Sequence, residues 1–162
     1  MALAALSAIA AAQSREEPRN WFGDPFVQLS AAIANCPEPL GPRATEDEML
    51  RQTHHRLERG TRCWLEGRCE RQSAYDYDRD IATRIVHAWA AHPEFARSTV
   101  WATVQGRIVY LEGCVRAPSL GAKLEAFARG IADVDLAVAF VFRPGTERLP
   151  YRTLAAAGSA PR

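Results

Sequence analysis

The sequence predicts an α+β fold from three observations. Apolar residues recur at spacings of three and four over residues 73–92, which is the period of an amphipathic helix. Two runs rich in β-branched and aromatic residues, 99–104 and 107–115, are separated by only Gln105-Gly106, which is typical of a hairpin. Residues 135–142 alternate in the same way and predict a third strand, and a helix is predicted before it over 118–131.

Length and charge exclude several classes of protein. The 162 residues, of which 48% are hydrophobic, are enough for one domain with a modest core and some appended segments. Twenty basic and nineteen acidic side chains leave a net charge of only +1, so we expect no nucleic-acid partner. No apolar run reaches the ~18 to 20 residues that cross a bilayer, so an integral membrane protein is not expected.

The two ends differ from the middle in composition. Residues 1–12 are uncharged and rich in Ala, and Ala10 and Ala12 fit the Ala-x-Ala rule of a cleavage site. This segment resembles a secretory signal peptide, with an ordinary Ala-rich helix as the alternative. After cleavage the mature chain would begin near Gln13, and its four cysteines would meet an oxidising compartment. Residues 144–162 are rich in Pro, Gly, Ala and Arg without periodicity, which predicts a flexible tail.

Two helices are predicted in the segment that precedes residue 73. The first is a short helix over 25–35, which is expected to end before a proline-rich break. Thr45 and Glu48 have the spacing of a capping box, so the second helix is predicted over 46–59, with Gly60 as its left-handed stop. The apolar stripe of the second helix is thin, so we expect this helix to pack against something larger.

Alternation within the hairpin assigns its side chains to two faces. A loop at Gln105-Gly106 would place Val104 opposite Arg107 and Ala102 opposite Val109. One face then carries Val100, Ala102, Val104, Val109 and Leu111, and the other carries Trp101, Thr103, Ile108 and Tyr110. In the last strand Leu136, Val138, Phe140 and Phe142 share a face, which we expect to join the first set beneath the helices.

Residues 109–115 resemble a signature of the BON domain family. Its Val-x-Leu-x-Gly-x-Val pattern is matched by Val109, Leu111, Gly113 and Val115. A later signature, a glycine and two valines before the last strand, is approximated by Gly130, Ile131 and Val134. The resemblance covers about residues 80–143.

The resemblance implies an αββαβ module, in which a three-stranded sheet carries two helices on one face. It also implies an exported protein of the bacterial envelope, in the periplasm or associated with the outer membrane. Such domains are thought to bind phospholipid surfaces or to act as interaction subunits of envelope complexes, and they are not known as enzymes. The chain then has four parts: a signal peptide-like segment (1–12), a helical, disulfide-stapled extension (13–72), the BON-like domain (73–143) and the flexible tail (144–162).

Two groups of residues are candidates for a lipid or partner surface. The first consists of Trp101, Ile108 and Tyr110, and the second of Arg59, Arg62 and Arg68. The first group would form an exposed apolar patch opposite the helices, unless the N-terminal half of the chain covers it. The second lies in a segment rich in guanidinium groups, which bind phosphate in a fork geometry, although interleaved glutamates could simply pair with them. We expect the partner to be a phospholipid surface or an envelope protein.

The four cysteines, Cys36, Cys63, Cys69 and Cys114, are candidates for two disulfides. One pairing joins Cys63 to Cys69 and Cys36 to Cys114, whereas the crossed pairings join Cys114 to Cys63 or Cys69. By alternation Cys114 lies on the same face as Trp101, which is the face that the N-terminal half is expected to meet. We therefore predict at least one bridge between the two halves.

A zinc-binding protein is the remote alternative, because His54 and His55 precede Cys63 and Cys69. The spacing matches no zinc-finger or ribbon pattern, and adjacent histidines point to different sides of a helix. A Cys-His nucleophile would need a third, orienting group, for which the sequence has no local signature. We therefore expect a protein that is not an enzyme and that has no cofactor.

Overall fold

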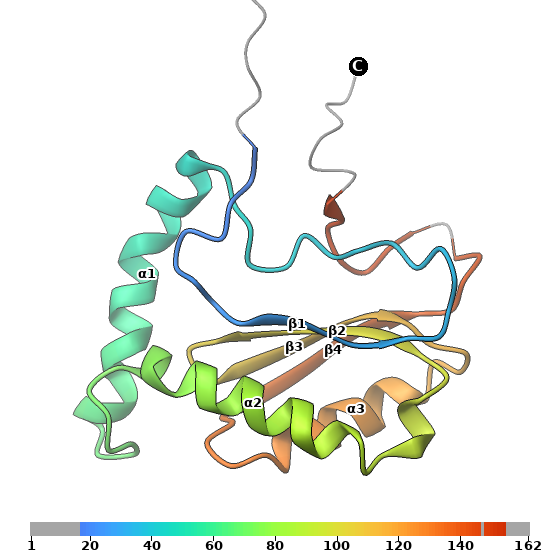
Figure 1. The fold of residues 1–162 in the computed structure, drawn as a ribbon. Coiled ribbons are helices and arrows are strands. Elements are labelled where there is room, and N and C mark those ends of the chain that lie inside the picture. Colours follow the sequence, from blue (N-terminus) through green and yellow to red (C-terminus); the bar gives the residue numbers. More distant parts are fainter. Residues whose placement is uncertain (1–16, 147, 155–162) are drawn as a thin grey trace, which may run out of the picture.

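One four-stranded sheet organises residues 17–146 and 148–154, the part of the chain that this computed structural model describes (Figure 1). The strand order is β1-β2-β3-β4, and only β3 and β4 are parallel. The elements in chain order are β1 (Phe26–Ala31), α1 (Glu46–Leu65), the 3-10 helix η1 (Ala74–Tyr77), α2 (Asp78–Trp89), the 3-10 helix η2 (Pro93–Phe95), β2 (Thr99–Gln105), β3 (Ile108–Cys114), α3 (Leu120–Arg129) and β4 (Leu136–Phe142). The predicted α+β class is confirmed. The signal peptide-like segment lies outside the described residues.

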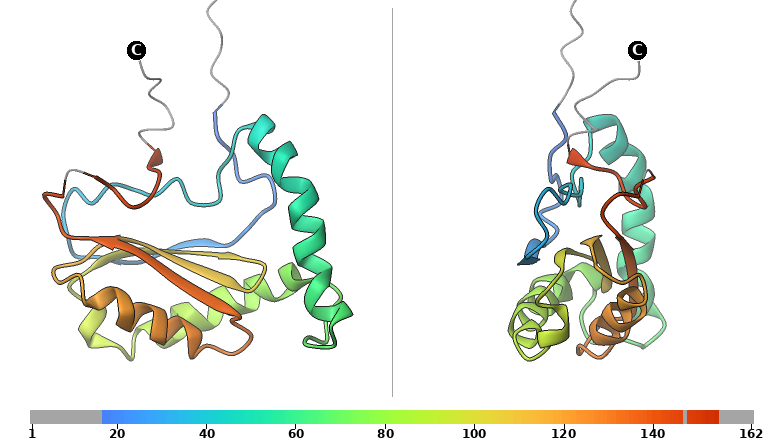
Figure 2. Two further views of the ribbon diagram at one scale, coloured as in Figure 1. Left: turned by 180° about the vertical axis from the view of Figure 1, so that it is seen from behind. Right: turned by 90° about the vertical axis from the view of Figure 1, so that its right-hand side faces the viewer.

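Helices α2 and α3 lie side by side on one face of the sheet and enclose the core with it (Figures 1 and 2). The fully buried side chains of this layer include Ile81, Ile85, Val100, Ala102, Val104, Val109, Leu111 and Leu124. The hairpin residues predicted to share this face are therefore all in the core. None of the helices described is both long enough and apolar enough to span a bilayer.

Strand β1 corrects the prediction of a helix over 25–35. It pairs antiparallel with β2, so the sheet has four strands rather than the three predicted. Val27 and Leu29 alternate toward the core, whereas the ring of Phe26 lies against Gly41 on the opposite face. This segment is extended because β2 offers it a row of backbone hydrogen-bonding groups at the sheet edge.

The hairpin of β2 and β3 turns one residue later than predicted, at Gly106-Arg107, and its strand pairing is therefore shifted by two residues. Gly106 and Arg107 both have positive φ, at 61° and 66°, as the central residues of a type I′ turn do. Val104 therefore pairs with Val109, and not with Arg107. The carboxylate of Asp78 holds this turn by accepting hydrogen bonds from the backbone N–H of Gly106 at 2.6 Å and of Arg107 at 2.8 Å. Because the pairing moves by two residues, every side chain keeps its predicted face.

Strand β4 presents its side chains to the faces opposite to those predicted. Its parallel register places Leu136 beside Ile108, so Leu136 and Phe140 face away from the helices and are 46% and 36% exposed. The small Ala137 points toward the core and is 3% exposed. Helix α3 packs closely against this face of β4: a Cβ on Gly121 would lie 3.3 Å from Val141 and 3.9 Å from Ala139.

The second face of the sheet lies beneath two segments from opposite ends of the described chain (Figures 1 and 2). Residues 32–44 run across it after β1, and residues 148–154 run alongside them. The backbone N–H of Leu40 donates to the carbonyl of Arg152 at 2.7 Å, and that of Leu154 donates to Glu38 at 3.1 Å. Trp101, on this face, is only 8% exposed. The sequence places residues 148–154 in a tail, but here they form part of the cover.

Helix α1 stands at one end of the sheet and continues past its predicted stop (Figure 1). Its capping box is present, with the N–H of Glu48 donating to Thr45 Oγ1 at 3.3 Å and the N–H of Thr45 donating to Glu48 Oε2 at 3.1 Å. Gly60 is not the stop. It is buried inside the helix, and a Cβ there would lie 3.2 Å from the ring of Tyr75, so a small residue lets α1 approach η1.

Two disulfides join Cys36 to Cys114 and Cys63 to Cys69. The crossed pairings are therefore wrong, and the predicted bridge between the two halves is confirmed. The first disulfide fastens the segment after β1 to the end of β3, and the second closes the loop at the end of α1. The second also joins the two cysteines of the remote zinc alternative to each other.

Candidate functional site

Four of the six residues predicted to form a lipid or partner surface line one pocket of about 210 Å³: Arg59, Arg62, Arg68 and Ile108. The other two do not join them. Trp101 is buried beneath the cover of the sheet, and Tyr110 lines a separate hollow beside Thr103. The predicted aromatic face is therefore not a continuous surface, whereas the predicted arginines do converge.

The pocket also contains an arginine that the sequence analysis missed. Arg59 and Arg62 come from the second half of α1, Arg68 comes from the disulfide-closed loop, and Arg107 comes from the hairpin turn. Arg107 Nε donates to the carbonyl of Asp133 at 2.7 Å, and its guanidinium lies 5.2 Å from the centre of the Tyr77 ring. Its signal in the sequence is its position after Gly106, which becomes informative once the turn is placed at Gly106-Arg107 rather than at Gln105-Gly106.

Buried Asp78 sets the position of this fourth arginine. Its carboxylate accepts hydrogen bonds from both backbone N–H groups of the turn, and Asp78 is only 3% exposed. Burial raises the pKa of Asp78 to about 6, although the hydrogen bonds from Arg107 and Gly106 oppose the shift. A buried hydrogen-bond acceptor therefore fixes the position of the turn.

Two carboxylates compensate part of the positive charge. Glu66 accepts from Arg62 at 2.9 Å and from Arg68 at 2.5 Å, and Asp135 lies 3.7 Å from Arg68. The hydrogen bonds from Arg62 and Arg68 lower the pKa of Glu66, so it stays ionised. Within residues 17–146 and 148–154, neither Arg59 nor Arg107 forms an ion pair with a carboxylate. Four guanidinium groups against two carboxylates leave the pocket positive.

The loop beside this pocket exposes large apolar side chains. The Cys63–Cys69 disulfide closes it, and Trp64 and Leu65 are 44% and 71% exposed there. We call residues 63–69 the disulfide tip. In the ribbon it forms the lower end of α1 and lies beside the start of α2, at about the level of the helical layer (Figure 1). Of this stretch, Arg68 and the two cysteines were predicted to matter, but the exposed tryptophan was not.

The arrangement can bind an anion next to an apolar surface. Guanidinium groups hold phosphate oxygens through pairs of hydrogen bonds, and an exposed tryptophan is suited to the boundary between water and an apolar phase. No family model matches the chain, and neither a curated protein nor a solved structure matches it. The resemblance to the BON family accordingly stays a prediction.

Proposed function

We propose that the protein is a non-enzymatic bacterial envelope protein that binds anionic phospholipid surfaces through the arginine pocket and the disulfide tip. The observation that carries this proposal is the convergence of Arg59, Arg62, Arg68 and Arg107 on one pocket. Cys63, which also lines this pocket, directly precedes the exposed Trp64 in the chain. The predicted binding of phospholipid surfaces is kept, but the aromatic residue that we propose to contact the lipid is Trp64 and not Trp101.

The two parts of the site supply two different forces. Each basic side chain near an anionic membrane surface contributes about 1 kcal/mol, so Arg59 and Arg107, which have no carboxylate partner in the described chain, carry most of the electrostatic attraction. Trp64 and Leu65 add burial of apolar surface, at about 25 cal/mol per Å². A tip closed by a disulfide loses little freedom when it inserts, which favours binding.

The disulfides also support the proposed compartment. Disulfides persist in oxidising environments such as the bacterial periplasm, and all four cysteines are paired. We place the protein in the periplasm or against the outer membrane as part of this proposal.

Vesicle flotation tests the electrostatic part. Vesicles with 30% phosphatidylglycerol should recover the protein at low salt, recover less at 0.5 M NaCl, and recover little when only phosphatidylcholine is present. The double variant Arg59→Gln/Arg107→Gln should lose most of the recovery on anionic vesicles. Arg97→Gln is the matched control, because Arg97 precedes β2 at the end opposite the turn. Equal recovery of all variants and on both vesicles would overturn the proposal.

A second pair of variants tests insertion of the tip. Trp64→Ser should reduce flotation at moderate salt, where apolar contacts carry more of the binding, and should abolish a blue shift of tryptophan emission on vesicles. Leu50→Ser is the control: it is 60% exposed on the same helix but lies 14 residues before Trp64, about 21 Å along the axis. A Leu50→Ser variant that is equally impaired would argue against insertion of the tip.

The alternative is a subunit that docks another envelope protein, and one observation favours it. Leu50, Leu57 and Trp64 recur at seven-residue spacing on the outer side of α1, and each is exposed. This is the pattern of a helix seam. A photo-crosslinking residue at Leu57 should then give one defined protein adduct in native membranes, and Leu57→Ser should remove a partner without changing flotation. Crosslinks to lipid alone would argue against this alternative.

A further inference from the structure

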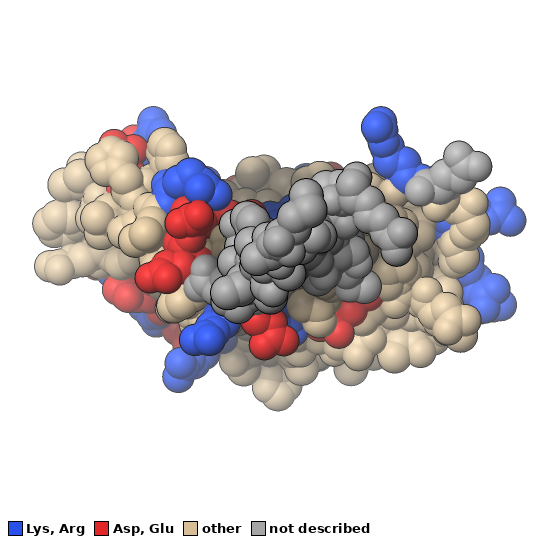
Figure 3. Space-filling model, turned by 90° about the horizontal axis from the view of Figure 1, so that it is seen from above, with Lys and Arg blue, Asp and Glu red and all other residues tan. Residues whose placement is uncertain are grey.

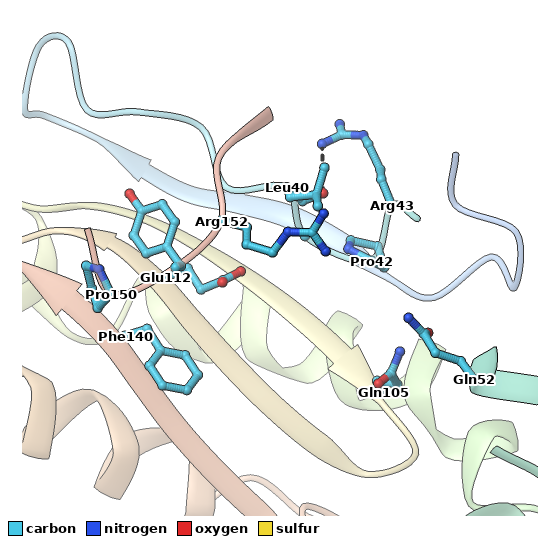
Figure 4. Close-up of a pocket in the computed structure, with 11 residues that line it drawn as sticks. Leu40, Pro42, Arg43, Gln52, Gln105, Glu112, Phe140, Pro150 and Arg152 are labelled. Atoms are coloured by element: carbon cyan, nitrogen blue, oxygen red, sulfur yellow. Dashed lines mark hydrogen bonds between the residues drawn. The ribbon is translucent and has the colours of Figure 1, made fainter. Parts of the chain in front are cut away.

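A second pocket, of about 360 Å³, lies on the opposite face of the sheet, beneath its cover (Figure 4). Its floor is formed by Glu112 of β3 and Phe140 of β4, and its roof by Arg43 and the segment that carries Tyr151 and Arg152. In Figure 4 the carboxylate of Glu112 points into the space between the sheet and these segments. The pocket is separate from the arginine pocket at the end of α1.

Glu112 is the unusual group in this pocket. Among the residues that the structure describes, no side chain or backbone group forms a hydrogen bond or an ion pair with its carboxylate. Burial raises the pKa of Glu112 to about 7, with no compensating donor. A half-buried carboxylate without a partner costs folding free energy, so its place on the floor of a cavity calls for a ligand that pairs with it.

A second polar group in the same region is also unsatisfied. The hydroxyl of Thr103, a residue only 5% exposed, has no hydrogen-bond partner in the described chain. It lines an adjoining hollow of about 200 Å³ that shares Gln105 and Glu112 with the larger pocket. Two unpartnered polar groups on neighbouring strands therefore face one connected space.

The two arginines of the roof are already paired. Arg43 forms an ion pair with Glu38 at 3.1 Å, and Arg152 forms one with Glu48 at 2.9 Å. Viewed from above, acidic and basic side chains lie next to one another around the middle of this face (Figure 3). The uncompensated charge of the pocket is therefore the negative charge of Glu112.

We propose that this pocket binds a small organic ammonium cation, whose N–H groups donate to Glu112 and whose apolar part packs against Phe140 and Tyr151. The volume lies in the range of small-molecule sites. A cation next to aromatic rings gains a further electrostatic contribution. The hydroxyl of Thr103 supplies a second hydrogen-bonding group for a ligand that reaches the adjoining hollow.

Binding of three related probes to the full chain tests the charge of the ligand. Phenethylammonium should bind, with chemical-shift changes at Glu112, Phe140 and Thr103 in an NMR titration at pH 8. The anion 3-phenylpropionate and the neutral 2-phenylethanol should bind at least tenfold more weakly. Equal affinity for all three, or no shift with phenethylammonium at 10 mM, would overturn the proposal.

Variants of Glu112 and Phe140 test whether these residues bind the ammonium ligand. Glu112→Gln keeps the shape of the side chain and should weaken binding of phenethylammonium at least tenfold. Glu94→Gln, which changes an exposed carboxylate in η2, should leave binding unchanged. Phe140→Leu should weaken phenethylammonium more than butylammonium, because only the first probe stacks its ring. The Arg59→Gln/Arg107→Gln variant should bind both amines as the parent does, so failure of lipid binding and failure of this inference are distinguishable. Unchanged affinity in folded Glu112→Gln would contradict the assignment.

Discussion

The guanidinium of Arg56 donates to both carboxylate oxygens of Asp24, at 2.9 and 2.6 Å, and so joins α1 to the segment before β1. Gln105 Nε2 donates to the same carboxylate at 2.8 Å, and the guanidinium lies between the rings of Phe22 and Tyr75. Both partners are nearly buried. This pair fixes the end of the sheet at which α1 stands.

Removing one charge of this pair should destabilise the protein strongly. Asp24→Asn leaves Arg56 buried without its counter-charge, which typically costs about 3 to 5 kcal/mol. Urea unfolding followed by circular dichroism measures the change. Arg62→Ala, which removes the exposed pair with Glu66, should change the free energy of unfolding very little and serves as the control. Similar values for both variants would show that the Asp24–Arg56 pair is not the link described.

The two disulfides should contribute unequally to stability. Loop-closure entropy gives about 4.5 kcal/mol for the Cys36–Cys114 bridge, whose separation is 78, and about 2 kcal/mol for Cys63–Cys69, whose separation is 6. Pairwise replacement by Ser and equilibrium unfolding compare the two. A larger loss from the shorter loop would contradict this order.

The short disulfide should matter more for vesicle binding than for folding. Cys63→Ser/Cys69→Ser frees the tip, so Trp64 must lose conformational freedom when it inserts, and binding should weaken severalfold. Flotation at moderate salt gives the measurement. The Cys36→Ser/Cys114→Ser variant, assayed well below its unfolding temperature, is the matched control and should float as the parent does.

Gly113 should be nearly irreplaceable. Its φ is 149°, and a Cβ there would lie 2.1 Å from the carbonyl oxygen of Thr99, which is too short for any real contact. Gly113→Ala therefore forces β2 and β3 apart, and we expect a loss of more than about 3 kcal/mol. Gly67→Ala, also at positive φ but with open space around it, should cost only about 1 kcal/mol. Thermal unfolding of the two variants separates backbone strain from the steric clash.

Glu112 should make stability fall as pH rises. Its pKa of about 7 in the folded protein lies above the ordinary value of 4.5. The contribution of Glu112 to the free energy of unfolding is therefore fully present below about pH 4.5 and is lost as the pH rises through 7. The charged and titratable groups that share its pockets are Arg43, Arg152, Tyr110 and Tyr151. Glu112→Gln should remove this part of the pH dependence and raise the unfolding temperature at pH 8. An unchanged pH profile would contradict the assignment, and phenethylammonium should stabilise the parent at pH 8 but not the variant.

Alternation along single strands was predictable from the sequence, because it depends only on local geometry. It placed Cys114 on the face opposite the helices, and a bridge between the two halves was predicted from that placement. The partner of Cys114, which is Cys36 and not Cys63 or Cys69, was left open. It could not orient β4, since the face that Leu136 joins depends on its register with Ile108, a residue far away in the sequence. Strand β1 was missed for a similar reason: Phe26, Leu29 and Ile33 have helical spacing, and only pairing with β2 makes the segment extended.

The candidate sites were predictable to different degrees. Arg59, Arg62 and Arg68 lie close together in the sequence, so their convergence could be expected from one helix and one short loop. Arg107 joins them only because Asp78 fixes the turn. The pocket of Glu112 depends on segments from both ends of the described chain, and no local pattern signals it.

The cover of the sheet also has a consequence for the order of assembly. The hydroxyl of Tyr151 donates to the carbonyl of Pro37 at 2.9 Å, across 114 positions of the chain. Contacts between such distant positions form late in folding, because a long loop must close first. The roof over Glu112 is therefore completed only when residues 148–154 pair with the segment that contains Pro37, and until then this face of the sheet is open to other proteins.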